Sequence, residues 1–275
     1  MKKEEFLTII RPPRGISLNL KELWEYRELL YFLIWRDIKV RYKQTLLGAG
    51  WAILQPFLSM VVFSIFFGKL AKIPTEGIPY PIFAYTALVP WNYFAHALNH
   101  GSLSLVEYQR IITKVYFPRI LVPLASVLSG LLDFFIAFLV LIGMMFYYHT
   151  PPTLATLTFP FFLGIAIITA FGISLWLSAL NVEYRDVRYA LPFFTQFMLF
   201  LSPVVYSSTL VPEKFQSLYG LNPMSGVIEG FRWALLGKAF PSPYLMVSSI
   251  GISLFLLFTG LLYFQRMERT IADIV

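Results

Sequence analysis

The fold is decided by residues 120–147, which read ILVPLASVLSGLLDFFIAFLVLIGMMFY. This stretch contains a single charged side chain, that of Asp133. A helix of about 20 apolar residues crosses the hydrocarbon core of a bilayer, so the stretch is long enough to span a membrane. The whole chain of 275 residues has the same character, because 57% of it is hydrophobic and only 13% is charged. An average soluble domain has roughly a quarter charged residues, so the sequence predicts an all-α integral membrane protein and argues against a soluble enzyme.

Five other apolar blocks are also long enough to span a membrane, which gives six predicted transmembrane helices in all. Seventeen Lys and Arg residues lie at the termini and in the connections on their side, and five lie on the other side. Since Lys and Arg are enriched in cytoplasmic loops, both termini are predicted to be cytoplasmic. The six spans are expected near 47–70, 80–104, 120–147, 155–181, 189–207 and 243–265.

Residues 208–241 are apolar but do not resemble a simple span. Seven Pro and Gly residues interrupt the segment, and it carries charges such as Glu229 and Arg232. Backbone that is not helical at membrane depth must be buried in protein or line water. We therefore expect short re-entrant helices that dip into the outer leaflet and return.

Residues 21–43 predict an amphipathic helix. At 100° per residue, five charged side chains fall within a sector of roughly 80°, with a wide apolar face opposite, as in a helix lying in the cytoplasmic membrane interface. They are Glu25, Glu28, Arg36, Lys39 and Lys43. Arg27, Asp37 and Arg41 nevertheless fall on the apolar side, and Asp37 and Arg41 are spaced to pair at i,i+4. Snorkelling to lipid headgroups or contact with a cytoplasmic protein would explain them. The chain thus divides into a cytoplasmic N-terminus, 1–43, and a transmembrane domain, 44–275.

The sequence lacks the motifs of several kinds of catalytic site. It has no cysteine, no GxxxxGK[ST] phosphate-binding loop and no GxSxG or HExxH motif. Its net charge of +7 is spread between apolar blocks, which argues against nucleic-acid binding. His96 and His100 share a helix face, but without a third ligand polar packing is favoured over a metal site. Asp133 either serves transport directly or makes a hydrogen-bonded contact between helices.

Aromatic side chains are concentrated in three predicted spans, the first, the second and the fifth. In the fifth span, four aromatic residues lie within about 80° of one another on one helix face. Such rings pack helices and face lipid, or they line a path for sugars, whose C–H faces stack on aromatic planes. The candidate channel-lining residues are Trp51, Phe57, Tyr85, Tyr189, Phe193, Phe197 and Phe200.

Four ordered blocks of residues, spread over nearly the whole chain after residue 20, form a specific pattern. They are Arg36 to Gln44 with Leu47-Gly48, Trp51 and Gln55-Pro56; Phe117-Pro118-Arg119 with Pro123; Asn181, Tyr184 to Tyr189, Pro192 and Gln196 with Ser202 to Tyr206; and Leu221 to Met224 with Gly226, Ile228, Gly230 and Arg232. This pattern resembles the six-span permease subunit of type-2 ABC exporters, in the O-antigen and teichoic-acid polysaccharide branch.

The resemblance implies a homodimer in the bacterial inner membrane that exports lipid-linked polysaccharide, with two copies of a separate ATPase subunit on its cytoplasmic side. ATP and Mg²⁺ would bind that partner, so no catalytic residue, metal or cofactor is expected in this chain. The implied roles are contact with the ATPase for Arg27, Asp37, Arg41, Arg110, Lys114 and Arg119; a cytoplasmic entrance element for Leu47 and Gly48; and an outer gate in 208–241 for Pro212, Asn222, Pro223 and Arg232.

Other functions fit the sequence less well. A drug or lipid cargo within the same superfamily is an alternative, and the block around Arg185-Asp186 with Ser202-Pro203 favours the sugar branch. A membrane-embedded glycosyltransferase or acyltransferase would need paired acidic metal ligands or a catalytic His–acid set, and neither is apparent. A secondary carrier would show inverted repeats with matched broken spans, and the sequence lacks such repeats.

Overall fold

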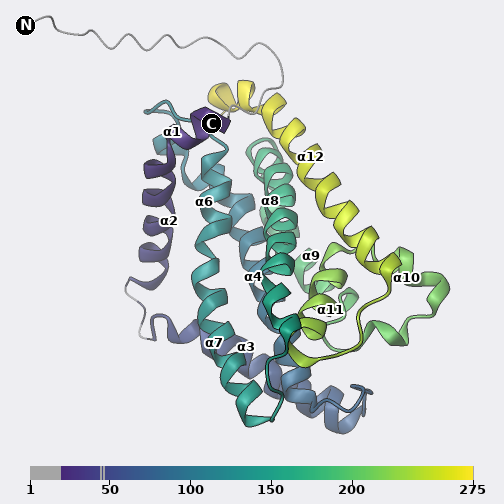
Figure 1. Ribbon diagram of the computed structural model, residues 1–275. Coiled ribbons are helices and arrows are strands. Elements are labelled where there is room, and N and C mark those ends of the chain that lie inside the picture. Colours follow the sequence, from purple (N-terminus) through teal and green to yellow (C-terminus); the bar gives the residue numbers. More distant parts are fainter. Residues whose placement is uncertain (1–19, 44, 46, 275) are drawn as a thin grey trace, which may run out of the picture.

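The computed structural model is a bundle of helices (Figure 1). It describes residues 20–43, 45 and 47–274, so the first part of the predicted N-terminal region, 1–19, lies outside the described residues. Every regular element of the described part is helical. The elements are α1 (Leu20–Glu25), α2 (Arg27–Tyr42), α3 (Gly50–Phe63), η1 (Ser64–Leu70), α4 (Tyr80–Glu107), α5 (Gln109–Ile112), α6 (Leu121–Ser129), α7 (Leu131–Tyr147), η2 (Leu154–Thr158), α8 (Phe159–Glu183), α9 (Val187–Leu201), η3 (Ser208–Leu210), α10 (Glu213–Tyr219), α11 (Pro223–Leu236) and α12 (Pro243–Ile274).

Four stretches within the described residues are helical, long and apolar enough to cross a membrane. They are Gly50–Leu70, Leu121–Tyr147, Leu154–Glu183 and Pro243–Glu268. Each matches one of the six predicted spans, so these four are confirmed as candidate membrane spans. The other two predicted spans are helices that fall short of the same standard, and the number six stays a prediction.

The second predicted span, α4, is long enough to cross a membrane, but its hydropathy is too low to meet the same standard. It packs against α3, α6, α7, α8 and α11, and most of its residues are buried. Polar residues such as Asn92, His96 and Asn99 lower its hydropathy. A helix in the middle of a bundle faces protein on most sides, so it can carry polar side chains that a helix in contact with lipid could not.

The fifth predicted span, α9, is apolar but short. Its 15 residues end at Leu201, whereas the sequence predicted a helix continuing to 207. The reason lies in Ser202-Pro203, because the residue before a proline is disfavoured in helical conformation and Ser202 is extended at φ −91° and ψ 152°. The chain beyond runs without helical hydrogen bonds, yet Val204 and Val205 are buried.

Side chains satisfy the backbone of this unwound segment. Arg232 donates to the carbonyl oxygens of Val204, at 2.9 Å, and Tyr206, at 3.1 Å. Tyr80 donates to the carbonyl of Val205 at 2.8 Å. Unpaired carbonyls in a dry environment cost several kcal/mol each in the bilayer interior, so these contacts explain how the chain leaves helical structure there.

Close approach of α8 and α12 depends on glycine. A side chain on Gly172 would meet the backbone of α12 at 2.6 Å, and one on Gly260 would lie 2.4 Å from the carbonyl oxygen of Gly172. Thr169 also donates a hydrogen bond across the two helices to Ser253, at 2.8 Å. Small residues and interhelical hydrogen bonds are the usual means of holding helices together where lipid surrounds them.

The helix predicted over 21–43 is broken at Tyr26 into α1 and α2 (Figure 1). α2 packs lengthwise along α6 through Leu33, which is buried. The predicted apolar face is only partly covered, since Trp24 and Tyr31 are largely exposed. The expected uniform amphipathic helix is therefore replaced by a kinked segment, one side of which is bound to the bundle.

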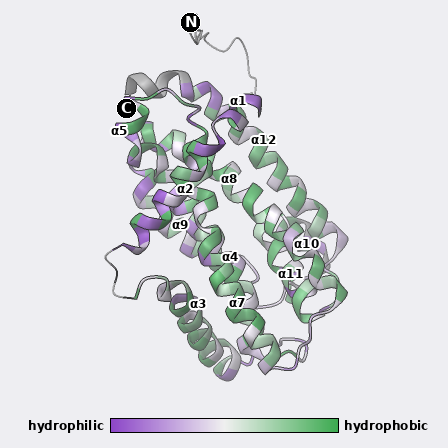
Figure 2. Ribbon diagram, turned by 60° about the vertical axis from the view of Figure 1, so that its left-hand side comes forward, coloured by the Kyte–Doolittle hydropathy of each residue, from purple (hydrophilic) through white to green (hydrophobic). Residues whose placement is uncertain are grey.

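The connections predicted to share a side of the membrane share an end of the bundle. At one end a buried cluster joins α2, the α5 region and α12 through Leu33, Ile112 and Phe264. At the other end Glu76 reaches Thr209 and Lys238. Figure 2 shows hydrophilic residues gathered around α1, α2 and α5, while α3, α7 and α12 are mainly hydrophobic. This arrangement is consistent with the predicted order of loops; which end faces the cytoplasm stays a prediction.

Candidate functional site

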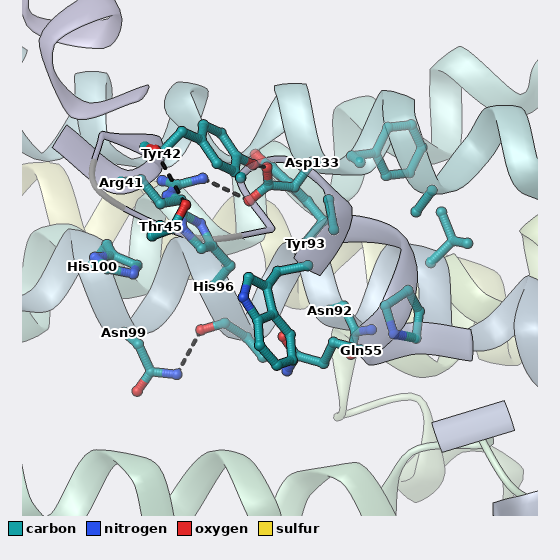
Figure 3. Close-up of a pocket in the computed structure, with 18 residues that line it drawn as sticks. Arg41, Tyr42, Thr45, Gln55, Asn92, Tyr93, His96, Asn99, His100 and Asp133 are labelled. Atoms are coloured by element: carbon teal, nitrogen blue, oxygen red, sulfur yellow. Dashed lines mark hydrogen bonds and ion pairs between the residues drawn. The ribbon is translucent and has the colours of Figure 1, made fainter. Parts of the chain in front are cut away.

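A pocket of about 320 Å³ lies where the end of α2, the start of α3, the middle of α4 and the first half of α7 meet. Figure 3 shows side chains from these segments converging on it. Both aromatic and polar side chains line its wall. The polar residues that define its chemistry are Arg41, Gln55, Asn92, His96, His100 and Asp133.

One wall of the pocket is built on an ion pair between α2 and α7. Arg41 Nη1 lies 2.6 Å from Asp133 Oδ2, with the two side chains 20% and 24% exposed. Arg41 Nη2 donates to Ser129 at 3.1 Å, and the Tyr42 hydroxyl donates to the other carboxylate oxygen of Asp133 (Figure 3). Asp133 is thus held in a hydrogen-bonded contact between helices, which was the structural alternative for this residue.

Arg41 pairs with Asp133 instead of Asp37, so the i,i+4 pair that the spacing allows is not formed. Asp37 accepts hydrogen bonds from the Tyr108 hydroxyl and, at 3.3 Å, from Ser126. Both charges therefore point into their own chain. Their position on the apolar side of the predicted helix reflects contact with α4, α6 and α7, which no local pattern contains.

His96 and His100 lie on the pocket side of α4, one turn apart, with ring centroids separated by 4.3 Å (Figure 3). His96 fits there because residue 130 is glycine, since a side chain at Gly130 would come within 2.7 Å of His96 Nδ1. Both ring nitrogens of His96 and the Asn92 Nδ2 are buried and find no hydrogen-bond partner among the described residues. Within the same part of the chain, no group of three or more His, Asp or Glu side chains is placed to hold a metal ion.

The predicted aromatic residues divide into exposed and buried. On α9, Tyr189, Phe193, Phe197 and Phe200 are all exposed on the surface of the single chain, and the rings of Phe193 and Phe197 stack with centroids 6.5 Å apart. On α3, Trp51 and Phe57 are about half exposed, and Trp51 also lines the pocket. Tyr85 differs from the others.

Tyr85 is fully buried at 0% exposure, and its hydroxyl lies 3.4 Å from the carbonyl oxygen of Ala137. In this chain its ring packs in the core between α4 and α7 and presents no surface to a path. Sequence periodicity could not separate it from the exposed rings, because the covering helices are distant in the chain.

The residues expected to contact an ATPase are also divided. Arg27, Arg110 and Lys114 are exposed, whereas Asp37 and Arg41 are engaged as described above. Arg119 joins two segments of the chain by donating to the backbone carbonyl of Glu268. The described part of the entrance element has Leu47 half exposed and Gly48 at φ +49°, a left-handed conformation that glycine adopts without strain.

The predicted outer gate contains a buried charge network. Arg232 is fully buried, pairs with Glu229 at 3.1 Å and stacks on the ring of Phe83. Lys238 lies 3.1 Å from Glu76 and 3.9 Å from Glu229.

The other predicted gate residues lie at the starts of the short helices. Pro212 is exposed and directly precedes α10. Asn222 caps α11 by accepting a hydrogen bond from the backbone N–H of Met224 at 3.1 Å, and Pro223 occupies the first turn. The short helices expected in 208–241 are therefore present, and their gating role stays a prediction.

No pattern in the sequence predicts that the residues of the pocket come together. Arg41, His96 and Asp133 were each singled out, but Arg41 and Asp133 are 92 positions apart and nothing in their spacing joins them. Asn92 and Ser129 gave no signal. An unexplained charge on an apolar helix face and an isolated acid within a span were the only hints that two such groups could meet.

The chain is similar over most of its length to known membrane transport proteins. The family described as ABC-2 type transporter matches residues 28–236. A protein from Klebsiella pneumoniae named O-antigen export system permease protein RfbA is 30% identical over 94% of this chain and 100% of its own length. A protein of the same name from Myxococcus xanthus is 27% identical over 92% and 98%. The polysialic acid transport protein KpsM of Escherichia coli is 22% identical over 86% and 92%.

Proposed function

The chain belongs to the ABC-2 type transporter family, and from that premise we propose that it is the permease subunit of an ATP-driven exporter of lipid-linked cell-surface polysaccharide. The observation that carries this proposal is the match, over 94% of this chain and the full length of the relative, to a permease named for O-antigen export. Apolar helices long enough to span a bilayer make the chain an integral membrane protein, as such a permease must be. A weaker likeness to a polysialic acid transporter also favours polysaccharide cargo over a drug or a simple lipid.

We propose that two copies of the chain form the channel in the bacterial inner membrane, with both termini cytoplasmic. The end of the bundle that carries α1, α2 and α5 then meets two copies of a separate ATPase subunit. Exposed cations at this end, Arg27, Arg110 and Lys114, are free to contact that partner. ATP binding to the partner drives transport only through contacts that differ between the open and closed permease.

The polymer passes along exposed aromatic rings. Those of α9, together with Trp51 and Phe57 of α3, offer stacking surfaces that the chain itself leaves uncovered. Such planes suit the C–H faces of sugars without selecting one hydroxyl pattern. The short helices α10 and α11 act as the outer gate, where the polymer leaves the membrane.

The test is deletion of the gene in the source bacterium, followed by complementation with the wild-type chain. We expect surface polysaccharide to disappear, polymer to accumulate inside the cell, and complementation to restore export. Co-purification of a tagged ATPase encoded beside the gene measures the partnership separately. Unchanged surface polysaccharide without internal accumulation would overturn the proposed function.

A further inference from the structure

Two residues that line the pocket described above carry buried polar atoms for which the described residues provide no partner. Asn92 Nδ2 and both ring nitrogens of His96 are buried without a hydrogen bond among the described residues. Leaving buried polar groups unpaired costs about 1–3 kcal/mol each, and native proteins contain few of them. These three atoms belong to two residues that line one pocket, so the side chains of its wall have hydrogen-bonding capacity that the described residues do not use.

The composition of the wall indicates the kind of ligand. Trp51, Tyr93 and Phe134 provide ring surfaces, and the amides of Gln55 and Asn92 stand among them. Ligand sites commonly combine apolar and aromatic walls with a few convergent polar groups. The volume of about 320 Å³ lies at the small end of the usual range, which suits a unit of one or two rings rather than a large molecule. The pocket is partly open, and Trp51 in its wall is half exposed.

The charges of the pocket argue for a neutral ligand. Arg41 and Asp133 neutralise each other at 2.6 Å, and Tyr42 and Ser129 occupy further hydrogen-bonding positions of the pair. The guanidinium is thus already engaged and is not held ready for a phosphate. An acyl chain would leave the nitrogens of Asn92 and His96 unpaired. Hydroxyl groups, which both donate and accept, match these nitrogens.

We infer that this pocket is a subsite that binds a neutral, polyhydroxylated sugar unit of the exported polymer within a single copy of the chain. The inference rests on the proposed function and deepens it by assigning a binding site away from the aromatic face of α9. Asn92 and His96 provide hydrogen bonds to hydroxyls, and Trp51 provides a stacking face. The Arg41–Asp133 pair positions the end of α2 against the pocket without contacting the sugar.

The test uses His96→Phe and Asn92→Leu in the full chain together with its ATPase. Each change removes unpaired polar atoms and keeps most of the side-chain volume. A purely structural role predicts unchanged or higher stability, because an unpaired buried polar group disappears. A binding role predicts lost export at normal protein level, so stability and export move independently.

The matched control is Gln265→Leu in α12. Gln265 Oε1 is also buried without a partner among the described residues, but it lies outside the pocket. Export is measured as the rate at which new polysaccharide reaches the cell surface. Binding is measured by saturation-transfer NMR with oligosaccharides released by mild acid from the surface polymer of the source cells. We expect about three- to tenfold weaker binding in each pocket variant, and no change in the control.

Three outcomes would overturn the inference: wild-type export in both pocket variants, lost export with unchanged oligosaccharide binding, or equal loss in the control. Failure of the proposed function itself looks different. In that case deletion of the gene leaves surface polysaccharide unchanged, whatever happens at Asn92 and His96.

Discussion

Two polar clusters at different places in the bundle use their charges in different ways. In the charge network of the predicted outer gate, called the outer network below, Arg232 is fully buried and its terminal nitrogens bond Glu229 and the carbonyls of Val204 and Tyr206. In the pocket, Arg41 and Asp133 keep about a fifth of their side chains exposed, and the nearby nitrogens of Asn92 and His96 have no partner among the described residues. The first cluster uses both terminal nitrogens of Arg232 to hold the surrounding backbone and Glu229, and leaves only its Nε without a partner among the described residues. The second leaves capacity unused, which is the property expected of a binding site.

The most damaging change should be Arg232→Leu in the outer network. Removing one partner of a buried ion pair costs about 3–5 kcal/mol, and here the carbonyls of the unwound segment lose their donor as well. We expect a large loss of thermal stability in the purified protein and little protein in the membrane. Arg232→Lys is the control, since it keeps the charge but not the fork that reaches two carbonyls. If the Arg232→Leu variant has normal stability, the network around Arg232 does not stabilise the fold, and the proposed difference between the two clusters is wrong.

A smaller loss is expected for Asp133→Ala in the pocket. Because the pair is partly solvated, the cost should be about 1–3 kcal/mol, measured as thermal stability in detergent. The double variant Asp133→Ala with Arg41→Met should recover part of this loss, since no unpaired cation remains. If Asp133→Ala loses as much stability as Arg232→Leu, the pocket pair also serves mainly to stabilise the fold. The two clusters would then not differ in the way proposed.

The variant Phe197→Leu tests whether the exposed aromatic rings of α9 contact the polymer. The ring is 53% exposed, and a swap that keeps most of the volume costs under about 1.5 kcal/mol of stability. Export should nevertheless slow at normal protein level, because leucine cannot provide a flat stacking face. Phe255→Leu in α12 is the matched control, since that ring is 60% exposed and lies outside the predicted path. Equal and small effects of the two variants would assign the α9 rings to packing or lipid contact.

The smallest effect should come from Glu76, at the rim of the outer network. Burial acts to raise the pKa of its carboxyl, but hydrogen bonds from Ser207 and Lys238 and the charge of Lys238 outweigh burial, so the pKa lies below the ordinary 4.5. Because the folded-state pKa is lowered, the stabilisation is complete above pH 4.5 and is lost as the pH falls through the lower folded value.

For Glu76→Gln we therefore expect a stability loss of at most about 1 kcal/mol at neutral pH, because the carboxylate is partly solvated. Unfolding curves of variant and wild type, recorded from pH 7 downward, should converge below pH 4.5. A difference that persists unchanged in acid would show that Glu76 acts through packing rather than through its charge.

The prediction from sequence was best where one element carries its own evidence. Uninterrupted apolar runs placed four membrane spans, and the Pro- and Gly-rich composition of 208–241 announced short helices. The prediction failed where contacts with another helix determine the position or the partner of a side chain. The spacing of Asp37 and Arg41 allows a pair within their helix, whereas in the structure Arg41 pairs with Asp133. The aromatic residue Tyr85 was grouped with exposed rings although α4 lies in the centre of the bundle.

The sequence by itself determined that this protein is helical, belongs in a membrane and resembles polysaccharide permeases. These properties depend on the length, composition and order of local segments. Only the tertiary structure decided which polar groups are satisfied. Arg232 reaches carbonyls more than twenty positions away, and His96 occupies the space left by Gly130. Whether a buried nitrogen has a partner depends on helices that meet in space, so a site defined by unpaired atoms becomes visible only after the chain has folded.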